Sequence, residues 1–203
     1  SYGKLDPYAM ALAAVDEALS NLACVGADVS QAALLDNFSW GDPEDPKTLG
    51  ALVRCAMGCR DAALGFSAPF ISVKDSLNNT YTDAKGAKHS IPGTLLISAL
   101  APVPDVRQAV TMDFKTANNP VYLVGWTSDE FGGSLWEQFS GETGGAVPLV
   151  EPKSAKDSLW AVSAAVRSGL VMSAHDLREG GLAVAAAEMA FSGEVGVRLD
   201  LER

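Results

Sequence analysis

Two Asp-Pro pairs, each followed by a long run rich in apolar residues, are the feature that most constrains the fold of this chain. They are Asp6-Pro7 and Asp45-Pro46. Aspartate is a favoured N-cap residue, and proline is favoured at the first helical position. The pairs therefore predict two long helices, which we expect to stop at glycines: residues 8–25 before Gly26 and residues 46–64 before Gly65.

Short apolar runs between and beyond these helices predict buried strands. The expected strands are residues 32–35, 69–73, 93–100, 121–126, 171–174 and 195–199, and further helices are expected at 155–168 and 181–191. Alternating strands and helices indicate an α/β fold with layered sheets. Prolines and asparagines in residues 102–119 indicate a connection, so we expect two domains, residues 1–112 and 113–203.

Composition excludes several classes of protein. The 203 residues carry a formal net charge of -10, which argues against non-specific nucleic-acid binding because that binding needs basic patches. The chain has no apolar run of membrane-spanning length and no signal-peptide pattern, so we expect a cytoplasmic protein. Its three cysteines, Cys24, Cys55 and Cys59, fit reduced thiols better than a disulfide framework or a zinc site.

Glu17 and Asn21 form the first candidate site. They are four residues apart and share one side of the first expected helix, on a face of small residues. Carboxylate and amide oxygens there are suited to Mg²⁺. The alternative is an exposed helix face with a local hydrogen bond between positions i and i+4.

Polar residues at two expected strand ends form further candidates. Asp36-Asn37 follows the strand at 32–35, and Lys74-Asp75-Ser76 follows the strand at 69–73. Ligands of open α/β sheets gather beyond the carboxyl ends of strands. The alternatives are an ordinary turn for the first group and ordinary loop polarity for the second.

The segment from His175 to Leu182 is the fourth candidate. Asp176 ends an expected strand, and Gly180-Gly181 opens an expected helix, whose N-terminus attracts anions. Asp176 is placed to hold a metal ion that bridges phosphates. The alternative is a local hydrogen-bonded pair between His175 and Asp176. Gly132-Gly133-Ser134 lacks the P-loop pattern, and neither His89 nor His175 supports a nucleophilic triad.

Six segments together resemble the phosphoribosylformylglycinamidine synthase family, within a superfamily that includes aminoimidazole ribonucleotide synthetase. In chain order they are DPYAMALAAVDEALSNLACVGAD (6–28), LLDNFSWGDPEDP (34–46), PFISVKDSLNNTY (69–81), IPGTLLISALAPVPDV (91–106), VYLVGWTSDEFGGSLW (121–136) and SAHDLREGGLAVAAAEMAF (173–191). The resemblance extends over nearly the whole chain.

The resemblance implies a fragment of a larger enzyme. Family members have two homologous halves, each with an N-terminal and a C-terminal α/β domain, and this chain resembles the second half. The implied domains are an N-terminal one without its first strand and a truncated C-terminal one. The family's catalytic histidines belong to the first half, so no catalytic residue is assigned here. N-terminal domains of the superfamily pair into a shared barrel, which implies packing on the first half or a homodimer.

The implied reaction is ATP-dependent. ATP phosphorylates the amide oxygen of formylglycinamide ribonucleotide, and ammonia from a glutaminase subunit or domain displaces the phosphate. The resemblance implies ATP or ADP and Mg²⁺ as ligands. Its implied metal ligands are Glu17, Asn21 and Asp176. Its implied nucleotide contacts are Asp36, Lys74, Asp75, Ser76, Gly180 and Gly181.

One position departs from the family pattern. The family loop has glycine where this chain has Val73, and a β-branched residue disfavours positive φ and close phosphate approach. We therefore expect a weaker phosphate contact at Lys74. Two alternatives stay open: another ATP-using member of the superfamily, such as aminoimidazole ribonucleotide synthetase, and a non-catalytic scaffold half whose nucleotide site is structural or empty.

Overall fold

The computed structural model describes residues 2–178 and 180–201. Its helices are α1 (Pro7–Cys24), α2 (Pro46–Phe66), α3 (Leu135–Ser140), α4 (Pro152–Arg167) and α5 (Gly181–Gly193). Its strands are β1 (Ala33–Ser39), β2 (Phe70–Ser76), β3 (Thr80–Thr82), β4 (Lys88–Ser90) and β5 (Thr94–Leu100). Three short 3-10 turns lie at Tyr2–Lys4, Val29–Gln31 and Val106–Gln108. Within the described residues, no helix is both long enough and apolar enough to cross a membrane.

The two long helices begin where the Asp-Pro pairs predict. The Asp6 carboxylate accepts hydrogen bonds from the Tyr8 and Ala9 amides, and Asp45 accepts one from the Thr48 amide. Each proline fills the first helical position, where a missing N–H costs nothing. The end of α2 was predicted two residues too early, because its turns continue through Gly65 and a left-handed residue, Ser67, stops the helix.

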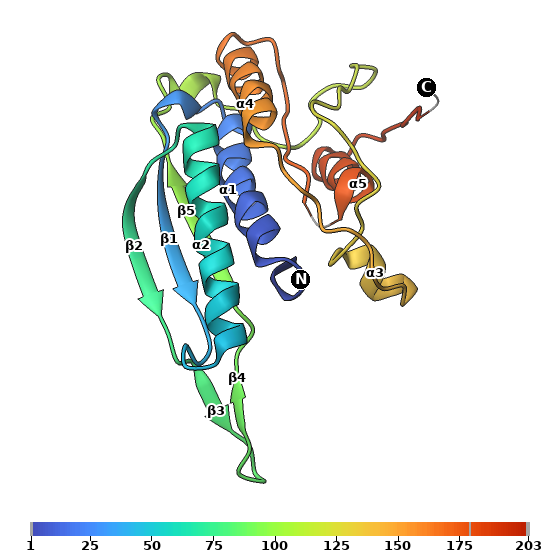
Figure 1. The fold of residues 1–203 in the computed structure, drawn as a ribbon. Coiled ribbons are helices and arrows are strands. Elements are labelled where there is room, and N and C mark those ends of the chain that lie inside the picture. Colours follow the sequence, from blue (N-terminus) through green and yellow to red (C-terminus); the bar gives the residue numbers. More distant parts are fainter. Residues whose placement is uncertain (1, 179, 202–203) are drawn as a thin grey trace.

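The sheet of the N-terminal part has the strand order β2-β1-β5. The central strand β1 runs parallel to β2 and antiparallel to β5. Helices α1 and α2 cover one face of this sheet (Figure 1), and the core between the layers is apolar. Its centre is built from Leu12, Val15, Leu34, Ala62 and Phe66. This is the layered α/β arrangement that the sequence predicts.

The other face of the sheet is bare. Alternate residues of a strand point to opposite faces, and the ladder between β1 and β5 places Leu96 and Leu100 on the face away from the buried Leu34 and Phe38. Both leucines are exposed. An uncovered apolar sheet face is typical of a surface that packs against another unit.

Residues 80–90 form a hairpin, where the sequence predicted no strands. Strands β3 and β4 pair antiparallel, and the hairpin projects beyond the sheet (Figure 1). Tyr81 stacks on His89 across the pair, with 5.1 Å between the ring centroids. Cross-strand pairs of this kind stabilise a two-stranded ribbon that the sequence pattern alone did not identify.

The three strands expected in the C-terminal part do not form. Residues 121–126, 171–174 and 195–199 have no strand pairing in the structure, although the helices expected at 155–168 and 181–191 are present as α4 and α5. A strand needs a neighbouring strand for its backbone hydrogen bonds. The described residues of this part supply none, and α3 is the one additional helix in it.

Helix α4 packs against the N-terminal layer although it lies beyond residue 112. Its buried Ser163 donates a hydrogen bond from Oγ to the carbonyl oxygen of Ala27, 2.6 Å away. A Cβ added to Gly26 would lie 2.7 Å from Val166 Cγ1, so the two segments touch closely. This contact brings the loop that precedes α5 alongside α1. The boundary at residue 112 stays a prediction.

Candidate functional site

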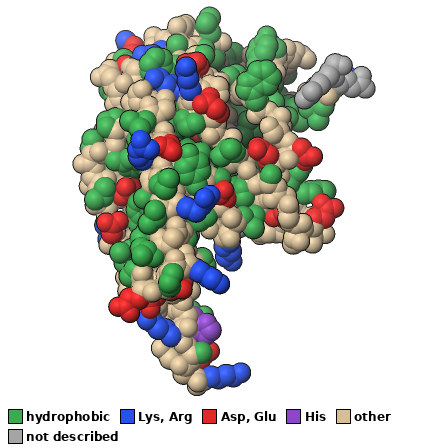
Figure 2. Space-filling view, in the orientation of Figure 1, with side chains coloured by type: hydrophobic (Ala, Val, Ile, Leu, Met, Phe, Trp, Pro, Cys, Tyr) green, Lys and Arg blue, Asp and Glu red, His purple; other side chains and the backbone are tan. Residues whose placement is uncertain are grey.

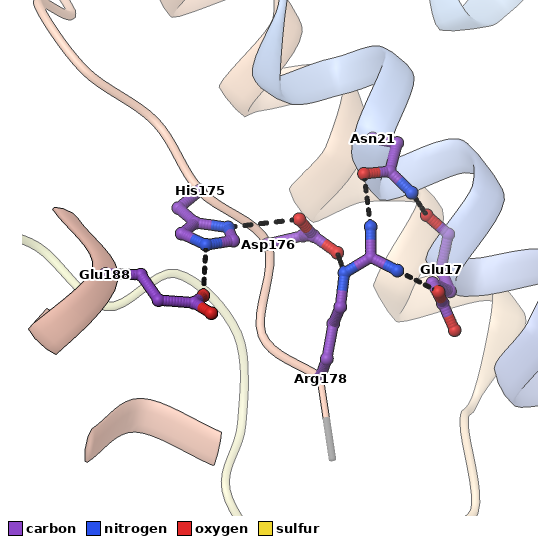
Figure 3. A network of polar contacts seen from close by, with 6 residues as sticks. All are labelled: Glu17, Asn21, His175, Asp176, Arg178 and Glu188. Carbon is purple, nitrogen blue, oxygen red and sulfur yellow. Dashed lines mark hydrogen bonds and ion pairs between the residues drawn. The ribbon is translucent and has the colours of Figure 1, made fainter. Parts of the chain in front are cut away.

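The guanidinium of Arg178 lies at the centre of a polar cluster that joins α1 to the loop before α5 (Figure 3). Its Nη1 donates a hydrogen bond to Glu17 Oε1, and its Nη2 donates one to Asn21 Oδ1 at 2.6 Å. Its Nε lies 2.8 Å from Asp176 Oδ2. The structure therefore brings together Glu17, Asn21 and Asp176, the three residues that the resemblance implied as metal ligands.

Helix geometry places the first two of these side chains. Glu17 and Asn21 are one turn apart on α1, on the side opposite Leu12, Val15 and Leu19, which lie in the core. Asn21 Nδ2 also donates a hydrogen bond to the Glu17 carbonyl oxygen, at 3.0 Å. The local hydrogen bond that we considered as the alternative is thus present together with the convergence on Arg178.

A second chain of contacts fixes Asp176. The ring of His175 lies between two carboxylates, with Nδ1 3.2 Å from Asp176 Oδ1 and Nε2 2.9 Å from Glu188 Oε2. The Asp176 side chain is 6% exposed. Its Oδ2 is buried and has no aligned hydrogen bond, so the ion pair with Arg178 compensates its charge. A buried oxygen in this state favours a cation beside it.

Asp16 belongs to the same neighbourhood and was missed by the sequence analysis. Burial, together with repulsion from Asp176 and Glu17, raises the pKa of its carboxyl from 3.8 to about 6. The available signal was its place next to Glu17 in a helix whose other residues are uncharged. The main cause is burial, and the carboxylates of Asp176 and Glu17 add to it, so Asp16 is easier to protonate than an exposed aspartate.

A hollow of about 540 Å³ opens beside the cluster. Asn21 and Cys24 of α1, Asp113 of the connecting segment, and His175, Asp176 and Arg178 line part of it. Burial, with the nearby negative charge of Asp176, raises the pKa of the Cys24 thiol to about 11, so this wall presents a neutral thiol. The hollow gives a ligand access to Asp176 and Arg178 from solvent.

The two glycines predicted to open a helix do so. Helix α5 starts at Gly181, whose φ is +62°, and its N-cap, Gly180, provides no side-chain hydrogen bond. A smaller hollow reaches these residues from His175, Asp176 and Arg178. The start of α5 thus lies next to the cluster, with the positive end of the helix directed at this region.

The strand-end candidates lie inside strands, which corrects the sequence analysis. Strand β1 continues through Asp36 and Asn37 to Ser39, and β2 continues through Lys74 and Asp75 to Ser76. The parallel ladder pairs Asp36 with Val73 and Asn37 with Lys74. Backbone hydrogen bonding thus carries both strands past the polar residues that were expected to end them.

These residues differ in their surroundings. Asp36 lies on the same face of β1 as the buried Leu34 and Phe38, its Oδ1 is buried without a hydrogen bond, and burial raises the pKa of its carboxyl. Lys74 and Asp75 are exposed, and Ser76 Oγ lies 3.3 Å from Asn79 Oδ1. No contact in the described part of the chain joins them to the Arg178 cluster.

Val73 is not strained where the family has glycine. It lies in β2, its side chain is exposed, and its φ is not among the positive values of the chain. The expected conflict between a β-branched residue and positive φ therefore does not arise in this conformation.

Magnesium fits the chemistry of the cluster but not its present arrangement. Two carboxylates and an amide are hard oxygen donors of the kind that Mg²⁺ prefers. The point on which they converge holds the Arg178 guanidinium instead. Among the residues that the structure describes, no group of three or more His, Cys, Asp or Glu is arranged to hold a metal ion.

Family models match both parts of the chain. The model of the AIR synthase related protein N-terminal domain matches residues 1–84, and that of the C-terminal domain matches residues 116–203. Together they leave only the segment between them unmatched.

Curated relatives match the chain over nearly its whole length. The phosphoribosylformylglycinamidine synthase subunit PurL of Deinococcus radiodurans is 38% identical, covering 98% of this chain and 27% of the relative. The PurL subunit of Thermococcus sibiricus is 34% identical, covering 100% of this chain and 27% of its own length. The chain thus spans about a quarter of these relatives.

Solved structures show the same fold. T. maritima PurL complexed with ATP superposes with a TM-score of 0.58 at 15% identity, covering 94% of this chain and 27% of that one. T. maritima PurL complexed with FGAR gives a TM-score of 0.61 at 16% identity, covering 94% and 29%. At this identity the likeness concerns the fold.

Proposed function

The chain belongs to the AIR synthase related protein family, and from this premise we propose that it is part of a phosphoribosylformylglycinamidine synthase and contributes a nucleotide-binding site to it. Identity of 34–38% to PurL subunits over nearly the whole chain supports this parent enzyme. Structures of T. maritima PurL with ATP and with ADP support a nucleotide as the ligand. The proposed parent acts in purine biosynthesis in the cytoplasm.

The observation that carries the nucleotide site is the convergence of α1 and the loop before α5 beside an open hollow. Glu17, Asn21, Asp176 and Arg178 meet there although 157 positions separate Asn21 from Arg178. The first turn of α5, after Gly180 and Gly181, adds backbone amides of the kind that suit phosphate oxygens, although the Gly181 amide itself is bonded to the Arg178 carbonyl oxygen. Side-chain oxygens that can bind a metal ion therefore lie near backbone amides that can donate hydrogen bonds to phosphate, as a metal-bound phosphate group requires.

In the proposed parent reaction, ATP phosphorylates the amide oxygen of formylglycinamide ribonucleotide, and ammonia then displaces the phosphate. Bound Mg²⁺ would supply charge neutralisation for the triphosphate. Glu17, Asn21 and Asp176 are the residues proposed to hold it, with His175 orienting Asp176 through the Nδ1 contact. We assign no catalytic residue in this chain, and the reacting groups are proposed to lie in the first half of the enzyme.

Asp36, Lys74, Asp75 and Ser76 are proposed as further nucleotide contacts. Because they lie within β1 and β2, a nucleotide has to reach the sheet itself to touch them. The exposed side chains of Lys74 and Asp75 are accessible in this way.

Partners follow from the bare sheet face. Leu96 and Leu100 of β5 give this face an exposed apolar surface that a second N-terminal domain would cover. We propose that this domain belongs to the first half of the same enzyme, or to a second copy when the chain is alone. A glutaminase subunit or domain is the proposed source of ammonia.

A scaffold role is the second candidate, and one observation favours it. Arg178 forms ion pairs with both Glu17 and Asp176, so the cluster is able to hold α1 and the loop together by itself. In that case the chain packs against the catalytic half and binds no nucleotide. Another ATP-using member of the superfamily is less well supported, since the relatives reported above are PurL subunits.

Calorimetry with ADP and MgCl₂ separates these functions. Nucleotide binding predicts measurable heat that Asp176→Asn abolishes, whereas Asp157→Asn, an exposed change on α4, leaves it intact. Absence of heat at millimolar nucleotide would favour the scaffold. The chain alone should make no product from formylglycinamide ribonucleotide, ATP and ammonia, and turnover would contradict the assignment of catalysis to the other half.

A further inference from the structure

All three nitrogens of the Arg178 guanidinium face the oxygens of the proposed cation position. Nη1 faces Glu17, Nη2 faces Asn21 and Nε faces Asp176 (Figure 3). The same oxygens cannot enclose a divalent ion while the guanidinium lies between them. The three oxygens thus form a cation site that already contains a cation.

We infer that Arg178 is the resident cation of the Glu17–Asn21–Asp176 site and excludes a divalent metal ion from it until the guanidinium moves away. This inference rests on the proposed function for the position of the metal ion, but metal exclusion by Arg178 does not depend on whether a nucleotide binds.

Charge and burial support this exclusion. Asp176 Oδ2 is buried without an aligned hydrogen bond, and its side chain is 6% exposed, so it depends on the cation beside it. A divalent ion placed next to the guanidinium would set like charges within a few ångströms of each other, at a cost that partial burial increases. Occupation of the site by Arg178 and by a metal ion is therefore mutually exclusive.

The side chain is the part that has to move. The Arg178 carbonyl oxygen accepts a hydrogen bond from the Gly181 amide at 2.8 Å, which holds its backbone to the start of α5. The Arg178 side chain is 38% exposed and borders the hollow of about 540 Å³. Rotation of the side chain into this hollow would free the three oxygens without unfolding the loop.

The experiment measures Mn²⁺ binding, by electron paramagnetic resonance and calorimetry, to the wild-type protein and its variants without nucleotide. Arg178→Gln keeps most of the side-chain stem and removes the charge. We expect it to bind Mn²⁺ at least about tenfold more tightly than wild type. Adding Glu17→Gln to it should remove the gain, because one of the two carboxylates is lost.

The matched control is Arg167→Gln. Arg167 has a similar exposure, 34%, and its ion-pair partner is Asp28, outside the site. It changes the net charge equally, so it should leave the Mn²⁺ affinity at the wild-type value. Thermal melting gives a second readout: Mn²⁺ should raise the Tm of Arg178→Gln more than that of wild type.

Three results would overturn the inference: equal Mn²⁺ affinity in wild type and Arg178→Gln, no Mn²⁺ binding in either, or a gain that survives Glu17→Gln. Nucleotide binding is scored separately by the ADP titration. A missing ADP signal with the expected Mn²⁺ gain refutes the proposed function alone, and the reverse pattern refutes this inference alone.

Discussion

Ser163 Oγ donates a hydrogen bond to the Ala27 carbonyl oxygen at 2.6 Å, and through it α4 is fastened to the segment that follows α1. Ser163 is completely buried, and the two residues are 136 positions apart. The contact joins the later part of the chain to the helix that carries Glu17 and Asn21. The geometry of the candidate site therefore depends on it.

Replacing Ser163 by alanine should lower the free energy of unfolding by about 1–3 kcal/mol, because a buried carbonyl loses its partner. The matched control is Ser158→Ala on the same helix, whose hydroxyl bonds locally to the Ser154 carbonyl oxygen at an exposed site. That change should cost no more than about 0.5 kcal/mol. Urea denaturation compares the two, and equal losses would show that the bond between α4 and α1 contributes nothing specific.

Gly58 marks the closest approach of α1 and α2. A Cβ at this position would lie 2.6 Å from the Tyr8 carbonyl oxygen and 2.8 Å from Ala11 Cβ. Gly58→Ala should therefore destabilise the protein by about 1–3 kcal/mol through overpacking, despite the better helix propensity of alanine. Thermal or chemical denaturation measures the loss.

Gly50 on the same helix is the control for this change. Nothing lies within 4 Å of a Cβ added there, so Gly50→Ala should stabilise the protein by up to about 1 kcal/mol. Opposite signs at the two glycines would confirm the close helix approach, and stabilisation by both changes would contradict it.

The N-terminal part was predictable because its signals are local. Asp6-Pro7 and Asp45-Pro46 set the starts of α1 and α2 through capping, which involves only neighbouring residues. Strand β5 also follows from a continuous apolar run. The lengths of β1 and β2 could not be predicted from the sequence. Pairing between the two strands keeps the polar Asp36 and Lys74 within the ladder, and this pairing is not a local signal.

The C-terminal part shows the other limit of sequence reasoning. The apolar run at 121–126 has strand composition, but its residues find no pairing partner among those that the structure describes.

Only part of the candidate site could be predicted from the sequence. Helical spacing put Glu17 beside Asn21, but nothing in the sequence shows that Arg178 lies between them and Asp176. That contact depends on the packing of α4.

Mixed surface charge agrees with the small-ligand interpretation. On the face shown in Figure 2, basic side chains lie among acidic and hydrophobic ones and do not form a continuous patch. Nucleic-acid binding requires a continuous basic surface.

Glu137 links two glycine segments in a pH-dependent way. Its carboxylate accepts hydrogen bonds from the Gly133 amide at 2.7 Å and from the Gly145 amide at 3.0 Å, and these bonds lower its pKa from 4.5. A lowered pKa means that the contact stabilises the fold above pH 4.5 and is lost as the pH falls through the folded-state value. Hydrogen exchange at Gly133 and Gly145 should therefore accelerate under acid conditions relative to the exchange expected for an unfolded chain.

Glu137→Gln tests the cause of this pH dependence. Glutamine keeps one acceptor oxygen but loses the charge and the second acceptor, so it cannot accept hydrogen bonds from both amides. Both amides should therefore exchange faster at neutral pH, and their exchange should no longer show an acid-dependent step. The control is Glu142→Gln in the same segment. The backbone amide of Glu142 donates to Ser140 Oγ, a bond that the change leaves in place, so the profile should be unchanged. A step that persists in Glu137→Gln would assign the pH dependence to another group.

The bare face of the sheet should govern association of the chain. Leu96 is 59% exposed on β5, so Leu96→Asp costs little in the separate chain but places a charge in the middle of any interface formed there. The control is Val106→Asp, at a residue that is 77% exposed on the 3-10 turn outside the sheet. Sedimentation velocity should show that Leu96→Asp weakens self-association by about tenfold or more. Val106→Asp should self-associate as strongly as wild type. If both variants associate as wild type does, the partner surface lies elsewhere than on the face of β5 that carries Leu96.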